Sequence, residues 1–312
     1  MLRMQVPTRD DIEAAAALIE RRVRRTPVIE LDVQVDGSAV PVIAKLELMQ
    51  HTASFKVRGA FHSVLSAPDR PRRLVAASGG NHGLAVAYAG RALGIPASIF
   101  LPETAPEVKV DRLRSLGAEV TQVGDTYAVA LAESAEAADQ PGALSLHAYE
   151  GWHTVTGQGT VGRELWEQAE LDTVLVAVGG GGLLGGIASW YGQDARLLAV
   201  EPEHSSCYHA AVVAGGPVDT TPSGLAADAL GASRIGEVGW AAMSGAGVGS
   251  ILVTADDIRE ARAWLWREVR IAAEPGGATA LAAVLSGAYR PSPAERVGVV
   301  ICGGNTNPSD LA

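Results

Sequence analysis

The chain has 312 residues, long enough for two compact lobes or one large α/β unit, and its 47% hydrophobic and 19% charged residues argue against disorder. A formal net charge of -10 leaves no basic surface for nucleic acid or an anionic membrane, and no apolar stretch reaches the roughly 18 residues of a membrane span. The N-terminal segment becomes acidic within its first residues, so a signal peptide is not expected. The two cysteines are far apart and form no CxxC pattern, so neither a disulfide framework nor a structural zinc site is expected. We therefore expect a cytoplasmic protein.

The first predicted element is a helix that follows Thr8, because Thr8 and Asp11 have the spacing of an N-terminal cap. Apolar residues then recur at helical spacing as far as the basic cluster 21–25, which precedes Pro27. From about residue 40, short apolar strands alternate with helices. The predicted strands are 41–46, 74–77, 97–101, 119–123, 173–178, 197–200 and 297–302. Two helices are predicted to begin at residues 56 and 183, and another is predicted just before the strand that starts at residue 173. Five more are predicted over 81–93, 106–116, 127–138, 256–271 and 277–285.

Strands that alternate with helices this regularly indicate mostly parallel sheets flanked by helices, which is the α/β class. The elements form two blocks that break near residues 148–153, so we expect two lobes. The small domain would span 42–147, and the large domain would combine 1–41 with 148–312. The segment 215–249 is rich in glycine and proline and weakly periodic, which predicts loops and short helices.

Lysine is rare in this chain, and the three candidates for imine chemistry are Lys45, Lys56 and Lys109. Lys45 falls in an apolar strand and Lys109 in a charged helical turn. Lys56 stands in the segment SFKVRGA, at a predicted helix start beside an aromatic residue and small residues. Such a lysine is either an ordinary solvated side chain or an amine in a partly desolvated cleft, where it can bond an aldehyde cofactor.

Two glycine-rich turns follow predicted strands. The segment ASGGNHG, residues 77–83, leads into a helix whose free N–H groups suit a carboxylate or phosphate, although many α/β proteins keep such a turn for packing alone. The segment VGGGGLLGG, residues 178–186, is either a flexible loop or a turn whose N–H groups converge on an anion. It lacks the GK[ST] of a P-loop, and its match to a dinucleotide pattern reflects only its glycine content.

A third candidate segment ends the last predicted strand, where CGGN occupies residues 302–305. A lone cysteine is most often a buried and inert thiol. It can also face a ligand, because α/β folds bind ligands at the carboxyl ends of their strands.

Together and in this order, these segments resemble the fold-type II pyridoxal-phosphate enzymes, in the serine/threonine dehydratase branch, whose fold is tryptophan synthase β-like. SFKVRGA matches the lysine segment, SGGNHG the asparagine loop, GGGGL the phosphate-binding loop and CGGN the final strand. AVEP at 199–202 and AAEPGGA at 272–278 also match. The resemblance covers nearly the whole chain.

The resemblance implies a role for each matching position. Lys56 would hold pyridoxal 5'-phosphate through an imine and, once released, would remove the Cα proton of the substrate. Phe55 would pack beside the cofactor ring, Asn81 would donate a hydrogen bond to its phenolic oxygen, and Cys302 would meet its pyridine nitrogen. The cofactor phosphate would lie on Gly179, Gly180, Gly181, Gly182 and Leu183. The substrate carboxylate would bind Ser78, Gly79, Gly80, Asn81 and His82.

The same resemblance implies elimination of the β-hydroxyl group of a small hydroxy-amino acid. L-threonine would give 2-oxobutyrate and ammonia, and L-serine would give pyruvate and ammonia. Because a thiol does not enforce protonation of the pyridine nitrogen, loss of a β leaving group competes well against transamination. A homodimer is expected from the family. Three alternatives stay open: an ammonia-lyase for another hydroxy-amino acid, such as 3-hydroxyaspartate or phenylserine, a serine racemase-like enzyme, and a non-catalytic ligand-binding α/β protein.

Three departures from the family pattern narrow this interpretation. Related serine racemases use a serine of the asparagine loop as a second proton donor, and Gly79 stands at that position, which disfavours racemisation. Those relatives also bind a divalent cation after the VEP segment. Here Glu201 is a candidate ligand, but Cys207 replaces an aspartate and a hard cation prefers oxygen, so a divalent cation is not favoured. The chain stops just beyond CGGN, so we expect no C-terminal regulatory domain and a catabolic or otherwise unregulated enzyme.

Overall fold

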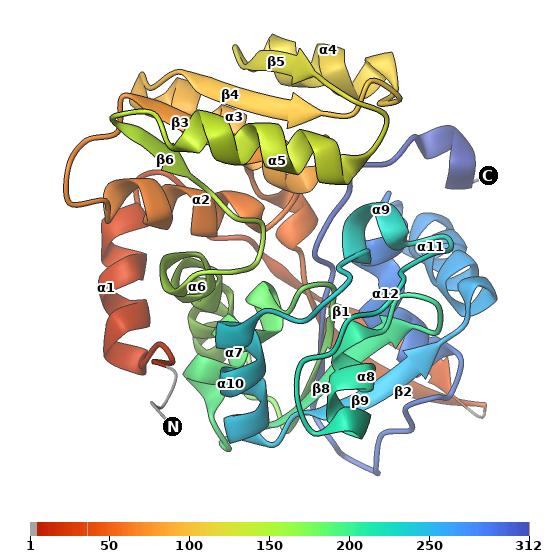
Figure 1. The fold of residues 1–312 in the computed structure, drawn as a ribbon. Helices are drawn as coiled ribbons and strands as arrows, with labels where there is room; N and C mark the ends of the chain where they lie inside the picture. The colour runs from red at the N-terminus through yellow and green to blue at the C-terminus, as the bar shows by residue number, and fades with distance from the viewer. Residues whose placement is uncertain (1–4, 36, 312) are drawn as a thin grey trace.

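Two separate β-sheets organise the chain, and helices pack against both (Figure 1). The computed structural model describes residues 5–35 and 37–311. Its strands are β1 (Val28–Val35), β2 (Ser38–Lys45), β3 (Arg73–Ala77), β4 (Ala97–Leu101), β5 (Glu119–Gln122), β6 (Ala143–Ser145), β7 (Thr173–Ala177), β8 (Arg196–Pro202), β9 (Gly249–Val253) and β10 (Val297–Val300). Its α-helices are α1 (Arg9–Ile19), α2 (Lys56–Leu65), α3 (Asn81–Leu93), α4 (Glu107–Ser115), α5 (Tyr127–Ala138), α6 (Trp152–Gln168), α7 (Gly182–Tyr191), α8 (Cys207–Ala214), α9 (Ala227–Leu230), α10 (Glu237–Ala246), α11 (Ala255–Val269) and α12 (Pro275–Leu285). Short 3-10 helices are η1 (Glu47–Met49), η2 (His51–Ala53) and η3 (Pro308–Leu311).

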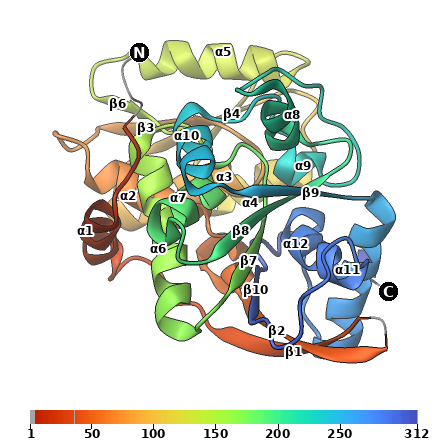
Figure 2. The ribbon, with the colours of Figure 1, turned by 90° about the horizontal axis from the view of Figure 1, so that it is seen from below.

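The larger sheet has six strands in the order β1-β2-β10-β7-β8-β9. Strands β1 and β2 are antiparallel, and every other neighbouring pair is parallel. Helices α6 and α7 lie on one side of β7, β8 and β10, and helices α11 and α12 lie on the other (Figure 2). A strand such as β7, which is apolar and buried along its whole length, requires this cover on both faces.

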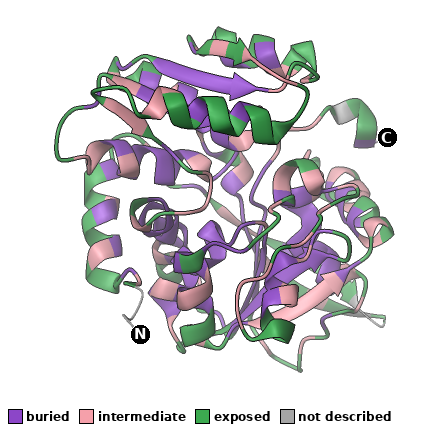
Figure 3. Cartoon of the chain, viewed as in Figure 1, coloured by how far each residue is buried: buried purple, intermediate pink, exposed green. Residues whose placement is uncertain are grey.

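The smaller sheet has four parallel strands in the order β5-β4-β3-β6. Because alternate residues of a strand face opposite sides, Leu74 and Ala76 of β3 belong to one hydrophobic cluster, and Val75 and Ala77 belong to another. The first cluster contains residues of α2 and α3, and the second contains Ala130 of α5. Helices therefore cover both faces of this sheet as well, and Figure 3 shows the strand β4 buried beside them.

The predicted α/β fold, with mostly parallel sheets flanked by helices, is confirmed. Helix α3 and strand β4 have the predicted bounds, and the side chains of Thr8 and Asp11 each bond the other residue's backbone N–H at the start of α1. Strands β1, β6 and β9 lie outside the predicted set. The segment 215–249 contains the helices α9 and α10 between loops, in agreement with its prediction.

The two sheets divide the chain close to the predicted domain boundaries. The smaller sheet uses strands between Arg73 and Ser145, inside the predicted small domain. Strand β2 places residues 42–45, the start of that domain, in the larger sheet, where they pair with β10. The assignment of 42–147 and of 1–41 with 148–312 as separate domains stays a prediction. None of the helices within the described ranges is long and apolar enough to cross a membrane.

A buried ionic cluster joins the helix that begins at Lys56 to its neighbours, and we call it the Arg58 cluster. It consists of Lys45, Glu47, Arg58 and Glu164. The wholly buried guanidinium of Arg58 donates to both carboxylate oxygens of Glu47 at 2.8 Å and to those of Glu164 at 2.7 Å and 2.9 Å. Lys45 Nζ donates to the same Glu164 at 2.7 Å. The cluster therefore fixes α2 against α6 and strand β2.

Candidate active site

A cavity of about 660 Å³ lies where the carboxyl ends of β3, β7 and β10 meet the start of α2. This is the edge at which parallel sheets bind ligands, and the volume suits a cofactor with a small substrate. Every position predicted to contact the cofactor or the substrate carboxylate lines this one cavity. These positions are Phe55, Lys56, Ser78, Gly79, Gly80, Asn81, His82, Gly179, Gly180, Gly181, Gly182, Leu183 and Cys302.

Lys56 is the first residue of α2, and its side chain is partly buried in the cavity wall. Its Nζ donates a hydrogen bond to the carbonyl oxygen of Ala148 at 2.7 Å and lies 5.0 Å from the centre of the Phe55 ring. Burial lowers the pKa of Lys56 to about 8, because the charged ammonium loses its hydration there. The lysine therefore has a far larger neutral fraction near neutral pH than an ordinary lysine, and the neutral amine is the form that bonds an aldehyde.

Asn81, the first residue of α3, is held by polar groups on both sides of its side-chain amide. Its Nδ2 donates to Glu274 Oε1 at 2.6 Å, and its Oδ1 accepts a hydrogen bond from Asn305 Nδ2. Glu274 is buried, and this burial raises its pKa to about 7. Glu274 stands in the matching segment AAEPGGA, but the sequence does not indicate its role, because the contact with Asn81 forms only in the fold.

The turn before α3 is built from small residues that leave the helix start open to the cavity. Ser78 Oγ accepts a hydrogen bond from the backbone N–H of Gly80 at 3.3 Å. A Cβ added at Gly79 would lie 3.0 Å from Leu101 Cδ2, so the wall is closely packed at this position. His82 Nε2 donates to the carbonyl oxygen of Leu146 at 2.8 Å, and burial lowers the pKa of His82 to about 3. His82 is therefore a neutral wall residue whose N–H is already used.

The four glycines between β7 and α7 form the opposite wall of the cavity. Gly181 has a φ of +85°, in the left-handed region that favours glycine. A Cβ added at Gly180 would lie 2.1 Å from the Tyr149 ring, so this ring packs directly on the loop. Helix α7 begins at Gly182, and the N–H groups of a first helical turn have no intrahelical partner. Together with the positive end of the helix, they suit a phosphate group.

Cys302 follows strand β10 and faces the cavity from a buried position. Its Sγ donates to the carbonyl oxygen of Gly276 at 3.4 Å. Burial raises the pKa of the Cys302 thiol to about 12, so the sulfur stays protonated and neutral at physiological pH. The residue predicted to meet the pyridine nitrogen therefore brings no negative charge.

Glu201 lies outside this cavity and has a structural role in the fold. The carboxylate is wholly buried and accepts the backbone N–H groups of Tyr208 at 2.8 Å and His209 at 2.7 Å, near the start of α8. The nearby Cys207 Sγ donates to the carbonyl oxygen of Gly179 at 3.2 Å. Across residues 5–35 and 37–311, no three His, Cys, Asp or Glu side chains gather in a group that could hold a metal ion.

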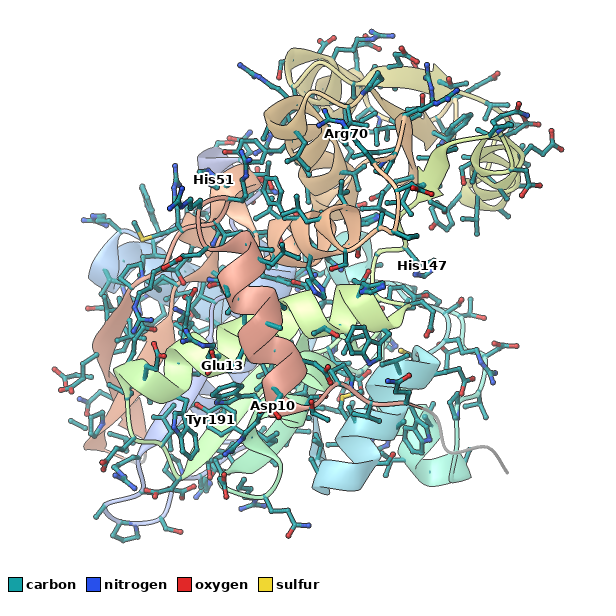
Figure 4. The ribbon with its side chains drawn as sticks, turned by 90° about the vertical axis from the view of Figure 1, so that its left-hand side faces the viewer. Asp10, Glu13, His51, Arg70, His147 and Tyr191 are labelled. Atoms are coloured by element: carbon teal, nitrogen blue, oxygen red, sulfur yellow. The ribbon has the colours of Figure 1, made fainter. Side chains whose placement is uncertain are left out.

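The cavity wall also contains charged and aromatic residues that the sequence motifs did not indicate. Lys109 of α4 and Asp228 of α9 form an ion pair at 2.6 Å, and Tyr127 and Tyr149 add aromatic rings. The ion pair joins residues 119 positions apart, so no spacing in the sequence signals it. His147 lies on the segment that links β6 to α6 between the two parts of the molecule (Figure 4).

Comparison with known proteins settles the family. The family described as pyridoxal-phosphate dependent enzyme matches residues 19–303. The chain belongs to the pyridoxal-phosphate dependent enzymes. It is 34% identical to phenylserine dehydratase of Ralstonia pickettii, over 100% of this chain and 98% of the relative. It is 31% identical to L-threonine ammonia-lyase of Thermotoga maritima, over 96% of this chain and 75% of the relative. The solved structure of maize serine racemase has a TM-score of 0.90 at 31% identity, over 98% of this chain and 96% of that one.

These matches confirm the fold-type II architecture and pyridoxal phosphate as the cofactor of this enzyme. The residues in the cavity fit that group chemically. A partly buried amine at Lys56 can bond its aldehyde, the start of α7 at Gly182 can hold its phosphate, and a neutral thiol at Cys302 can face its pyridine nitrogen. The individual roles of these residues stay predictions.

Proposed function

We propose that this enzyme is an ammonia-lyase that removes the β-hydroxyl group of L-threonine or L-serine and yields 2-oxobutyrate or pyruvate with ammonia. The observation that carries the proposal is the gathering of the lysine, the asparagine loop, the glycine loop and the neutral Cys302 thiol in one cavity. The similarity to proteins named L-threonine ammonia-lyase and phenylserine dehydratase supports the same class of reaction.

In this proposal Lys56 acts at two points. Its neutral amine first bonds the cofactor and later, once released, accepts the proton from the substrate Cα. Pyridoxal phosphate, when bound, withdraws electrons from that carbon. Because burial already lowers the pKa of Lys56 to about 8, the free amine can accept a proton near neutral pH.

The start of α3 positions the substrate through its carboxylate. The turn Ser78–His82 presents the N-terminal end of the helix to the cavity, and a carboxylate there is stabilised by free N–H groups and by the helix dipole. Lys56 lines the same cavity, so the Cα proton of a substrate held at this turn can face the amine. Orientation of this kind contributes to the rate by holding the reacting atoms together.

Two residues favour elimination over other outcomes of the same chemistry. The protonated Cys302 thiol brings no charge to the pyridine nitrogen, which favours rapid loss of the β-hydroxyl group over transamination. Gly79 has no side chain to return a proton on the second face of the substrate, and Leu101 fills the adjacent space. Racemisation is therefore not part of the proposal.

A hydroxy-amino acid with an aromatic side chain is the second candidate substrate. Leu101, Pro102, Pro106, Tyr127 and Tyr149 give the cavity wall apolar and aromatic surface. A wall of this kind favours a phenyl group over the methyl group of threonine, because more apolar area is removed from water. The relative named phenylserine dehydratase is similar over 98% of its length, which adds to this candidate.

The test is to load the purified protein with pyridoxal phosphate and supply L-threonine, L-serine and 3-phenylserine in turn. Formation of the corresponding 2-oxo acid is measured together with the visible absorbance of the bound cofactor. We expect 2-oxo acid from at least one substrate in the wild type and none from Lys56→Ala, with Arg114→Ala on the exposed side of α4 as the matched control. A loaded wild-type protein that acts on none of the three would refute the proposal.

The amino-acid substrate belongs to this proposal, as do the homodimer and the cytoplasmic location expected for the enzyme. Sedimentation velocity of the loaded protein tests the dimer directly. A monomer at micromolar concentration would contradict it.

A further inference from the structure

Two side chains, Asn305 and Glu274, hold the side-chain amide of Asn81 from either side. Its Oδ1 accepts from Asn305 Nδ2, and its Nδ2 donates to Glu274 at 2.6 Å. A side-chain amide has one carbonyl oxygen and two N–H groups. These bonds use the oxygen and one N–H, and one N–H remains for the cavity that Asn81 lines.

The orientation of an amide depends on whether its neighbours can donate or accept. Glu274 does not decide the orientation of Asn81, because a carboxyl group whose pKa is about 7 is present both as an acceptor and as a donor near neutral pH. If Asn81 were reversed, it would turn its carbonyl oxygen toward the cavity. An acceptor there would repel the phenolic oxygen of the cofactor instead of donating to it.

Asn305 decides the orientation of Asn81, because its own partners cannot exchange roles. Its Nδ2 donates to the backbone carbonyl oxygen of Thr52 at 2.9 Å, and a carbonyl can only accept. Its Oδ1 accepts from Arg112 Nη2 at 2.5 Å, and a guanidinium can only donate. Asn305 must therefore present an N–H to Asn81, and Asn81 must present its oxygen to Asn305.

We propose that Asn305, held by Arg112, is a positioning residue that fixes the side-chain amide of Asn81 with its second N–H toward the cofactor. The inference rests on the proposed function, in which Asn81 donates to the phenolic oxygen of the cofactor. Arg112 lies on α4 beside the smaller sheet, and Asn305 follows β10 of the larger sheet. The arrangement therefore links the packing of the two sheets to the donor that faces the cofactor.

The decisive variant is Asn305→Asp, which keeps the shape of the side chain and its bond from Arg112. Its oxygens cannot donate, so the amide of Asn81 turns its N–H groups toward position 305 and its oxygen toward the cavity. A hydrogen bond to a charged group contributes about 1.5–3 kcal/mol, so we expect the affinity for pyridoxal phosphate to fall roughly ten- to a hundredfold. The visible absorbance band of the loaded protein should shift at the same time.

A second set of variants on α4 separates positioning from added charge and from misfolding. Arg112→Leu leaves position 305 uncharged and frees Asn305 to reverse, so we expect the same changes at smaller size. It removes one positive charge, and Arg114→Leu, which removes the same charge from the same helix, is its matched control. Arg112→Lys retains a donor and should restore the wild-type band and affinity. Arg114→Leu removes an exposed arginine that pairs with Glu107 and should change neither property. If Asn305→Asp does not fold, as judged by circular dichroism, the comparison of Arg112→Leu with Arg114→Leu decides.

Wild-type affinity and an unshifted band in folded Asn305→Asp, or in Arg112→Leu if the first variant is lost, would overturn the inference. These readouts need no turnover, so they are separate from the proposed function. A wild type that binds the cofactor with a visible band but converts no hydroxy-amino acid refutes the reaction, while the band and affinity of the variants still decide the role of Asn305. A wild type without any band overturns both.

Discussion

Replacement of Arg58 by methionine should destabilise the fold strongly, although the residue is not part of the cavity wall. Arg58 is wholly buried, and its guanidinium donates to two carboxylates, Glu47 and Glu164, and to Thr160 Oγ1 at 3.1 Å. The Arg58 cluster contains two positive and two negative side chains. Arg58→Met removes one positive charge, so two buried carboxylates are left with Lys45 as their only formal counter-charge in the cluster.

The size of the effect follows from this uncompensated charge. Removal of one partner from a buried ion pair costs about 3–5 kcal/mol of unfolding free energy, whereas an exposed pair contributes about 0–1 kcal/mol. For a chain of this size, the same loss lowers the melting temperature by roughly 5–8 °C. The double variant Arg58→Met with Glu47→Gln restores the balance of charge, so it should lose less than the single variant by about 1–2 kcal/mol.

The assay is urea unfolding of the cofactor-free protein at pH 7, followed by circular dichroism, with Arg114→Met as the exposed control. Arg114 pairs only with residues of its own helix α4 in the ion pairs of the described chain. A loss below about 1 kcal/mol for Arg58→Met, equal to the control, would show that the buried charges of the Arg58 cluster do not depend on this guanidinium. A double variant that is less stable than Arg58→Met would show that lost packing, and not charge, is the cause.

Charged groups in the cavity set three further expectations. Burial lowers the pKa of Lys56 to about 8, so the rate at which the cofactor-free protein binds pyridoxal phosphate, followed by stopped-flow absorbance, should rise through pH 8; a rise centred near pH 10 would contradict this. Burial raises the pKa of Glu274 from 4.5 to about 7, so the folded protein holds this proton more tightly than the unfolded chain, and the contribution of Glu274 to stability is lost as the pH rises from about 4.5 to 7. In Glu274→Gln, the free energy of unfolding should therefore decline less steeply over this pH range, by up to about 1.4 kcal/mol per pH unit. Urea unfolding at several pH values measures this slope, and a slope equal to that of the wild type would count against the expectation. Asp228→Asn should free the Lys109 cation and raise kcat/KM for 3-hydroxyaspartate over L-threonine by about fivefold, equivalent to a 1 kcal/mol ion pair; an equal change for both substrates would argue against selection at this wall.

The elements that the sequence predicted well are those with a strong local signal. Helix α3 begins after a glycine turn and ends at Gly94 in the left-handed conformation, and strand β4 is a short buried apolar run. Strand β1 also had a signal, because Leu31 and Val33 are buried while their neighbours are exposed, yet the run VIELDVQV lies outside the predicted strands. The start of the small domain was placed within β2, since a strand in isolation does not indicate which of two sheets it joins.

The candidate site divides in the same way between local and long-range information. Phe55 and Lys56 stand at the start of α2, and the other predicted residues of the cavity stand in or beside short glycine-rich segments at the ends of strands. Segments at strand ends converge by the rule that parallel sheets bind ligands at their carboxyl ends. The contacts of Asn81 with Glu274 and Asn305 join residues 193 and 224 positions apart. The pairing of Lys109 with Asp228 likewise depends on how α4 and α9 pack. No local pattern specifies such contacts, because they depend on the relative placement of whole elements.

The scarcity of lysine and the burial of both thiols limit how this enzyme can be conjugated. Lys45 is wholly buried, Lys56 and Lys109 line the cavity, and Cys207 and Cys302 are buried. Apart from the chain terminus, a reagent that acylates amines therefore finds its targets at the mouth or floor of the cleft, and a maleimide finds no exposed thiol. Immobilisation through amines would block the entrance, whereas a tag or an engineered surface cysteine on α11 would leave it open. The same distribution makes acylation of Lys56 a direct report of whether the cleft is occupied.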